Sequence, residues 1–472
     1  MASRRDQLQA HQFLGQRVVS ALVVRETDPE QPPFRRPTVA AIGSFAVAVI
    51  ALAVVGIYGM IVPGGNRSWQ AGDAVVIEKE TGTRYVYLDG RLHPAANYAS
   101  ALLALGRHAP SRRVSRASLV GVPRGPRIGI PDAPDALPGP DRVLDGSWTF
   151  CSQPGVDRTG AAVPESVLMV GRRPAAGQSM DGRALLVEAA ETGRRHLLAG
   201  GYRHEIDERD AEAVRVALGA GSAIRVSPAV VEVLPAGHPL GPIAVPDAGQ
   251  PSRAVPGRTD IRAGQVLVAA TSEGVRHYLA EVERLRPISP LQTDIQLASA
   301  SSATAYGTGH PAAVPLSLLE AASAVQAPDV PAAAGDPPRV PPRFAAGDAG
   351  TTICLVFDPG AAVPHLILNP PMPAADPMAA TPGRTADGAR MADRMVVPPG
   401  WVAVVESMPA PAAPAGTVLV VTDLGVAHPL ADVALLEVLG YPAARPTRMP
   451  ASLVARIPLG SGLSHSAALR RA

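Results

Sequence analysis

Two cysteines, Cys151 and Cys354, are the only ones among the 472 residues. Each lies beside an apolar, strand-like run, GSWTFC and TICLVFD, so the pattern favours a disulfide that joins two strands of one sheet. Such a bond would close a loop of about 200 residues and stabilise the fold by several kcal/mol in the loop-closure account. Two separately buried thiols are the alternative, and a metal site with two sulfurs and no nearby histidine is disfavoured.

A second feature with chemical potential is a phrase that occurs four times, as TGTRYVYLDGRLH, TGRRH, EGVRH and LGVAH. When the copies are aligned on their glycine, the position three residues later is occupied by Tyr85, His196, His277 or His428. Each copy supplies only one such residue and the first copy has tyrosine, so repetition explains these positions better than a shared metal ion does. We therefore predict no metal site and no cofactor.

Signatures of catalysis and of nucleotide binding do not occur in the sequence. Lys79, in VIEKET, is the only lysine, and no glycine-rich loop precedes it, so a Walker A phosphate site is not expected. Neither a Gly-x-Ser-x-Gly elbow, nor a His-Glu-x-x-His helix, nor a convincing carboxylate pair is found. The formal net charge of +2 is too small to indicate an electrostatic grip on nucleic acid. We accordingly expect neither an enzyme nor a nucleic-acid-binding protein.

The basic residues are almost all arginines, and several of them gather between Arg107 and Arg127, with Arg112, Arg113 and Arg116 inside this run. Such a run can contact an anionic polymer of the cell envelope. A solvated face is the simpler interpretation, because surface charges of this kind usually have no partner. The sequence favours the solvated face.

The repeated phrase belongs to a longer structural unit. An apolar, strand-like run precedes each glycine, namely AVVIE, ALLVEA, QVLVAA and TVLVVT. Since glycine adopts the positive φ that tight turns require, we predict hairpins that turn at Gly82, Gly193, Gly274 and Gly425. A helix-like segment follows each hairpin, and three copies share a tail that contains proline and glycine. The glycine spacings of 111, 81 and 151 residues are unequal, which indicates separate modules rather than a regular solenoid.

Residues 38–62, TVAAIGSFAVAVIALAVVGIYGMIV, contain no charge over 25 positions. A helix of this length rises far enough to cross a hydrocarbon core of roughly 30 Å, so we predict one transmembrane helix. Arg35 and Arg36 abut its amino-terminal end, which places the first 37 residues in the cytoplasm and the following bulk across the membrane. That compartment would allow a disulfide to persist.

The segment before the span predicts a further short helix. Leu8, Leu14, Val18 and Leu22 fall near one side of a helix, with polar residues elsewhere. This helix would lie on the membrane or pack on a partner, and a solvated juxtamembrane helix is the alternative.

Several of these stretches together resemble the EccB family, a membrane core component of the type VII (ESX) secretion systems of actinobacteria. The resemblance is carried by QAHQFLGQRVVSALVVRETDPEQPPFRRP, ETGTRYVYLDGRLHPAANYASALL, SLVGVPRGPRIGIPDAPDALP and SWTFC. It runs in order along essentially the whole chain. The stretch from Gly309 to Gly400 contributes little to it beyond Cys354.

The resemblance implies an α+β, single-pass protein of the inner membrane, with its N-terminus in the cytoplasm and an elongated periplasmic part of four small repeat modules around a β-rich central domain. Implied partners are the EccC ATPase, EccD, EccE, a mycosin protease, further EccB copies and membrane lipid. The implied function is a structural subunit that braces the periplasmic side during export of WXG100, PE and PPE proteins. An envelope-polymer-binding module and an unconventional ATPase, as some family names state, are the alternatives.

The repeats and cysteines together predict an order in which modules interrupt the central domain. The expected parts are a cytoplasmic helix (1–37), the transmembrane helix (38–62), module 1 (63–131), the first part of the central domain (132–170), module 2 (171–250), module 3 (251–330), the second part of the central domain (331–400) and module 4 (401–472).

Overall fold

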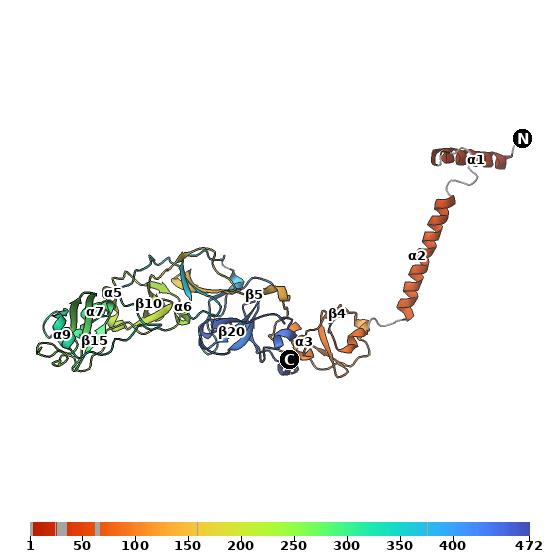
Figure 1. Ribbon diagram of the computed structural model, residues 1–472. Helices are drawn as coiled ribbons and strands as arrows, with labels where there is room; N and C mark the ends of the chain where they lie inside the picture. The colour runs from red at the N-terminus through yellow and green to blue at the C-terminus, as the bar shows by residue number, and fades with distance from the viewer. Residues whose placement is uncertain (1–2, 24, 26–34, 62–66, 158, 375) are drawn as a thin grey trace. The chain divides into compact units, whose positions relative to one another are not determined.

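The computed structural model describes residues 3–23, 25, 35–61, 67–157, 159–374 and 376–472 (Figure 1). The chain divides into two compact units. Unit 1 comprises Met1–Leu92 and Ser111–Gly125, and unit 2 comprises His93–Pro110 and Pro126–Ala472. Small mixed sheets and short helices make up both units, so the predicted α+β class is confirmed.

Two helices form the amino-terminal part of unit 1, α1 (Arg4–Val23) and α2 (Arg35–Ile61). Within α2, Pro37–Tyr58 is long and apolar enough to cross a membrane, and its side chains are not covered by protein. The side chains of Arg35 and Arg36, used above to predict orientation, lie outside what the structure describes. On α1 the four apolar residues of the predicted stripe are all exposed.

Module 1 shows the plan that the other modules share. Its four-stranded sheet has the order β3-β2-β1-β4, and β4 runs parallel to β1. A parallel return needs a crossover connection, and helix α3 supplies it. The elements are η1 (Ser68–Ala71), β1 (Val75–Glu78), β2 (Arg84–Leu88), β3 (Arg91–Pro94), α3 (Tyr98–Leu105), β4 (Ser111–Val114) and the tail helix α4 (Arg116–Leu119).

Modules 2 and 3 repeat this plan within unit 2, with sheet orders β11-β10-β9-β12 and β15-β14-β13-β16. Module 2 contains β9 (Leu185–Ala189), β10 (Arg195–Ala199), β11 (Tyr202–Ile206), η3 (Glu208–Asp210), α5 (Ala211–Leu218), β12 (Ile224–Val226) and α6 (Pro228–Val233). Module 3 contains β13 (Val266–Thr271), β14 (Gly274–Ala280), β15 (Leu285–Ile288), α7 (Pro290–Ala298), η4 (Ala300–Ser302), α8 (Ala303–Tyr306), β16 (Val314–Leu316) and α9 (Leu318–Ser323).

Module 4 has the same order of strands, but its repeated phrase lies one hairpin later than in the other copies. Its sheet reads β22-β21-β20-β23, and β20 takes the place that β1 holds in module 1. Gly425 therefore turns between the second and third strands. The elements are β20 (Val402–Met408), β21 (Thr417–Val421), β22 (Ala427–Pro429), α10 (Leu435–Val438), β23 (Thr447–Pro450), α11 (Ala451–Val454) and α12 (His465–Ala468).

The sequence alignment on glycine missed this shift because β20 and β21 are both apolar and either can precede a turn. It also described each copy as a two-stranded hairpin, whereas three consecutive strands precede each crossover helix. The third and fourth strands are short and carry polar residues, so periodicity alone did not reveal them.

The central sheet has six strands in the order β19-β7-β6-β17-β18-β8. The two parts of the chain that supply them are separated by modules 2 and 3. The strands are β6 (Trp148–Val156), β7 (Ala162–Met169), β8 (Gln178–Ser179), β17 (Ile353–Phe357), β18 (His365–Leu368) and β19 (Arg394–Val396), accompanied by η2 (Pro140–Arg142) and η5 (Pro377–Ala379).

The sequence predicted that the first part of the central domain ends at residue 170, and the pairing of two short strands differs from that boundary. β8 belongs to the central sheet although it follows residue 170, and β5 (Val143–Leu144) pairs with β20 of module 4 although it precedes that residue. Both pairings join segments that are far apart in the sequence, so no local pattern predicts them.

Crossover helices pair two modules in unit 2. Helix α5 of module 2 packs against α7 of module 3 (Figure 1). Val214 and Leu218 share one apolar core with Leu291 and Ile295. Helix α3, whose residues belong to unit 2, packs on α12 and α10.

Candidate functional site

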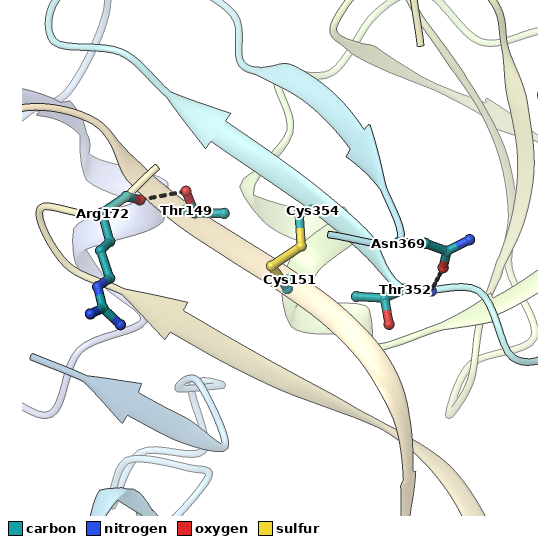
Figure 2. The surroundings of a disulfide bond; sticks show 6 residues. All are labelled: Thr149, Cys151, Arg172, Thr352, Cys354 and Asn369. Atoms are coloured by element: carbon teal, nitrogen blue, oxygen red, sulfur yellow. Dashed lines mark hydrogen bonds between the residues drawn. A yellow bond between two sulfur atoms is a disulfide. The ribbon is translucent and has the colours of Figure 1, made fainter. Parts of the chain in front are cut away.

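The disulfide lies at the centre of the six-stranded sheet. Cys151 on β6 and Cys354 on β17 are directly opposite one another in the antiparallel ladder, with their Cα atoms 4.0 Å apart and a sequence separation of 203. Figure 2 shows the sulfur–sulfur bond between these neighbouring strands, and hydrogen bonds from Thr149 to Arg172 and from Thr352 to Asn369 nearby. The disulfide therefore joins two strands of one sheet, as the sequence predicted.

The disulfide is fully enclosed. Both cysteines are 0% exposed and pack with Val167 and Met169, and Met372 and Val396 border the cluster. A cross-link over 203 residues removes about 5 kcal/mol of loop-closure entropy from the unfolded chain. Its burial keeps aqueous thiols away, so its role is structural.

One continuous hydrophobic core extends from the central sheet into two modules. It contains Phe150 and Leu355 from the central sheet, Val187 from module 2, and Val405 and Leu453 from module 4. The tail helices of modules 2 and 4 meet there, and the Ser452 hydroxyl donates to the main-chain oxygen of Val233 at 3.1 Å. We call this assembly of the central sheet, module 2 and module 4 the hub.

Ion pairs tie the two parts of the central sheet together. Arg394 on β19 donates to both carboxylate oxygens of Glu165 on β7, at 2.7 and 2.9 Å, and its side chain is only 8% exposed. Next to it, the Asp393 carboxylate accepts from the main-chain nitrogen and the hydroxyl of Ser166. Two-pronged pairs of this kind hold a fixed geometry, so β19 is locked onto β7.

A second ion-pair network joins the three parts of the hub. Arg390 contacts Glu191 at 2.6 Å and Glu232 at 3.2 Å, both in module 2, and Arg456 of module 4 contacts Glu232 at 3.0 Å. The arginine side chains are 17% and 13% exposed. Arg390 lowers the pKa of Glu191, and burial lowers the pKa of Arg456. Removing one partner would leave a largely buried charge without its counterion.

A hollow of about 760 Å³ borders this network. Its walls come from the β6–β7 hairpin, from module 2 and from residues 382–393. Its three arginines face three carboxylates, and the carboxylates already bind arginines or serines of the chain. The hollow thus has no excess of one charge.

The glycines predicted at turns all have positive φ. Gly82 and Gly193 donate to the main-chain oxygen four residues earlier, at 2.8 and 2.9 Å, whereas Gly425 donates three residues back. Gly274 is the first residue of β14 rather than part of the turn before it. Only at Gly425 would an added Cβ meet another part of the chain, at 2.9 Å from the Cβ of Met395.

The histidines at equivalent positions of the modules differ from those that the alignment on glycine placed together. His93, His204 and His428 occupy the third strand of modules 1, 2 and 4, and the Nδ1 of each lies 3.2, 2.8 and 3.2 Å from a main-chain oxygen of the module's tail. The sequence separations are 33, 34 and 33 residues. This recurring separation, rather than the distance from a glycine, was the signal that could have found them.

The buried histidines are suited to a structural role. Burial lowers the pKa of His196, His204 and His428, which favours the neutral imidazole at neutral pH. Among the residues that the structure describes, no three His, Cys, Asp or Glu side chains are grouped as metal ligands would be. His277 instead contacts the Thr293 hydroxyl at 3.0 Å.

Comparison with known proteins places the chain. A family profile described as "Type VII secretion system ESX-1, transport TM domain B" matches residues 1–472. The "ESX-2 secretion system ATPase EccB2" of Mycobacterium tuberculosis is 32% identical over 326 residues, which are 67% of this chain and 62% of that protein. The "ESX-3 secretion system ATPase EccB3" of the same species is 29% identical over 61% of this chain and 55% of its own length.

Solved structures agree with this placement. The fold resembles a chain in the "Structure of an intact ESX-5 inner membrane complex" with a TM-score of 0.61 and 23% identity, covering 100% of this chain and 96% of that one. A chain in the "Structure of EccB3 dimer from the ESX-3 core complex" gives a TM-score of 0.61 and 26% identity over 84% of this chain and 100% of its own. The chain spans 62% of the length of the first relative. The match over all 472 residues shows that the chain belongs to the EccB family of type VII secretion systems.

Proposed function

We propose that this protein is a structural subunit of a type VII secretion membrane complex and braces the complex on its periplasmic side while WXG100, PE or PPE proteins are exported. The proposed partners are EccC, EccD, EccE, a mycosin protease of the same system and further copies of this chain. The observation that carries the proposal is the hub, in which a buried disulfide, two ion-pair networks and one core join segments from three parts of the chain.

The proposed topology follows from α2 and the disulfide. Helix α2 crosses the inner membrane, Arg35 and Arg36 remain on the cytoplasmic side, and the modules and central domain lie in the periplasm. A disulfide in the hub supports this side, because the periplasm allows such bonds to persist and the cytosol reduces them.

We also infer that the four modules, with boundaries close to those given above, are the family's repeat domains and that the glycines at 82, 193, 274 and 425 shape their hairpins. The common strand order supports this inference, because each module returns its fourth strand parallel to its first.

We infer that the chain does not hydrolyse ATP, although relatives carry that activity in their names. The single lysine lies in the first hairpin without a glycine-rich approach, so the usual contacts to nucleotide phosphates cannot be assembled around it. The purified full chain, free of EccC, should release phosphate from ATP no faster than a matched blank. Hydrolysis that survives further purification and follows the protein peak would contradict this inference.

The structural role is tested by isolating the tagged full chain from its own membranes in mild detergent. We expect it to migrate on blue-native gels in a large complex that contains EccC, EccD and EccE. The paired variant Cys151→Ala with Cys354→Ala should lose that complex, while single substitution of the exposed Leu424 should retain it. A chain that is recovered without these subunits and binds bare peptidoglycan would instead indicate an envelope-binding module.

A further inference from the structure

Charge is distributed unevenly along the chain. Between Arg67 and Gly125 the sequence has nine basic and four acidic residues, whereas from Pro126 onward it has 28 basic and 33 acidic residues. The first module is therefore basic, although the net charge of the whole chain is only +2. This module follows directly after the membrane helix.

Most acidic side chains of the first module are already engaged within unit 1. Asp73 pairs with Arg112 at 3.1 Å, and Glu78 pairs with Arg116 at 2.8 Å. Glu80 accepts from the main-chain nitrogen of Arg116 at 2.9 Å. Arg116 is the main cause of the lowered pKa of Glu78, whose residue is only 4% exposed. These three carboxylates are thus engaged with Arg112 and Arg116.

The opposite face of the sheet presents cations around an apolar residue. Ile77 on β1 lies directly beside Arg84 of β2 and Arg113 of β4, so these three side chains project to one side. Lys79 follows Ile77 by two positions, directly after the end of β1, and its main-chain nitrogen donates to the main-chain oxygen of Val114 on β4 at 2.9 Å, which extends the pairing by one residue. Ile77 is half-buried, and Lys79 and Arg113 are exposed. Within the described residues of the chain, neither Lys79 nor Arg113 has an ion pair.

We call Ile77, Lys79 and Arg113 the basic rim, and they lie at one end of the sheet. Farther along the same face, Val75 and Val86 are fully buried. The rim therefore combines a partly exposed apolar centre with surrounding positive charge. Anionic lipid headgroups fit such a surface, because they attract the cations while the boundary with the acyl chains accepts the apolar side chain.

The covalent connection keeps the first module near a membrane. Six residues separate the end of α2 at Ile61 from the start of η1 at Ser68. A fully extended chain of that length spans at most about 20 Å. Anionic headgroups attract cations within about one Debye length, roughly 10 Å at physiological salt. A short tether thus supplies a high local concentration of lipid surface to the module.

We propose that the basic rim of module 1, formed by Ile77, Lys79 and Arg113, docks on the anionic headgroups of the leaflet from which α2 emerges. The docking is electrostatic, selects for acidic lipids and holds the first sheet against the bilayer. It applies on whichever side of the membrane the module lies, so it stands or falls independently of the proposed secretion role.

Lys79 provides a readout because it is the only lysine in the chain. The full chain is reconstituted in nanodiscs of purely zwitterionic lipid or of zwitterionic lipid mixed with phosphatidylglycerol, and an uncharged amine-reactive ester is added at low salt. Mass spectrometry of the Lys79 peptide gives the rate of modification. We expect the rate to be at least about fivefold lower in the anionic discs, the factor that corresponds to about one surface charge contact. High salt should abolish the difference, because it screens the attraction.

Two variants sharpen this test. Arg113→Gln should bring the two rates to within about twofold, because it removes one of the two cations of the rim. The matched control, Arg225→Gln, removes an exposed arginine outside module 1 and should keep the protection. Circular dichroism should show that both variants remain folded.

Equal Lys79 rates for the wild type in the two kinds of disc would overturn the proposal. Protection that arises only when a soluble polyanion such as polyglutamate is added, and not from phosphatidylglycerol, would also overturn it and assign the rim to an anionic polymer.

Discussion

Modules 2 and 3 have the same strand order, yet their tail helices have opposite surroundings. In module 2, Val230 and Val231 of α6 are each 2% exposed and belong to the core of the hub. In module 3, Leu318 and Leu319 of α9 are 59% and 79% exposed. One supersecondary unit can therefore serve as a part of the hub or as a peripheral unit, depending on what its last helix contacts.

The two tail helices are also stabilised by different forces. Helix α6 begins at a proline and relies on apolar burial. Helix α9 begins with a capping box, in which Ser317 and Glu320 satisfy each other's main-chain nitrogens, and Arg258 contacts Glu320 at 3.0 Å. The hydrogen bonds from Ser317, followed by that from Arg258, lower the pKa of Glu320 to about 2. Local polar contacts thus supplement the small apolar contact of α9, in which Ala321 is the buried residue.

The largest effect should come from breaking the disulfide. Cys151→Ala with Cys354→Ala removes the cross-link and should lower the free energy of unfolding of the hub by about 5 kcal/mol. Hydrogen exchange should accelerate in the central sheet, module 2 and module 4, while β13 and β14 of module 3 keep most of their protection. Loss of protection to the same extent in module 3 would show that it depends on the hub after all.

A buried and an exposed leucine on two tail helices give the most direct comparison. Leu453→Ala on α11 opens a cavity at a residue that is 0% exposed and should cost about 2 to 5 kcal/mol in chemical denaturation. Leu319→Ala on α9 removes a side chain that is 79% exposed and should change stability by less than about 0.5 kcal/mol. If the two substitutions cost the same, Leu319 is covered in the assembled protein.

Removing one carboxylate should loosen the joint between modules 2 and 4. Glu232→Gln takes the counterion from Arg456 and one of two from Arg390, and should cost about 1 to 2 kcal/mol, since Glu232 itself is partly exposed to solvent. Glu283→Gln in module 3, which breaks an exposed pair with Arg253, is the matched control and should be nearly silent. Equal effects would mean that burial of the arginines contributes little.

Modules 2 and 3 should lose stability at different pH values when the solution is acidified. His196 and His204 of module 2 have pKa values lowered by burial from 6.5, so the unfolded chain binds more protons and stability falls as the pH drops below 6.5. In module 3, Glu320 and Asp260 have pKa values lowered to about 2, so their contribution is present above 4.5 and 3.8 and is lost as the pH falls towards 2. Hydrogen exchange at pH 6.5 and below should show module 2 weakening first, and the reverse order would refute this assignment.

Much of the architecture could be predicted from the sequence, because local patterns determine it. Twenty-five uncharged residues predict a spanning helix in any fold, since length and apolarity alone decide it. The strand-like runs around Cys151 and Cys354 indicated two strands of one sheet, and the ladder places the cysteines directly opposite. The repeated phrase predicted separate modules from a local pattern, because a strand-like run and a turn glycine recur in each copy.

Only the tertiary structure determined the contacts between segments that are far apart in the chain. It moved Gly425 to a different hairpin and made His93, His204 and His428 the equivalent histidines. It also paired β8 with β18, which lies almost two hundred residues later in the chain. It also grouped Arg390, Glu232 and Arg456 from three parts of the chain. Local sequence sets whether a segment is a strand or a helix, but strand partners and buried ion pairs depend on which distant surfaces exclude water together, and that is determined only when the chain has folded.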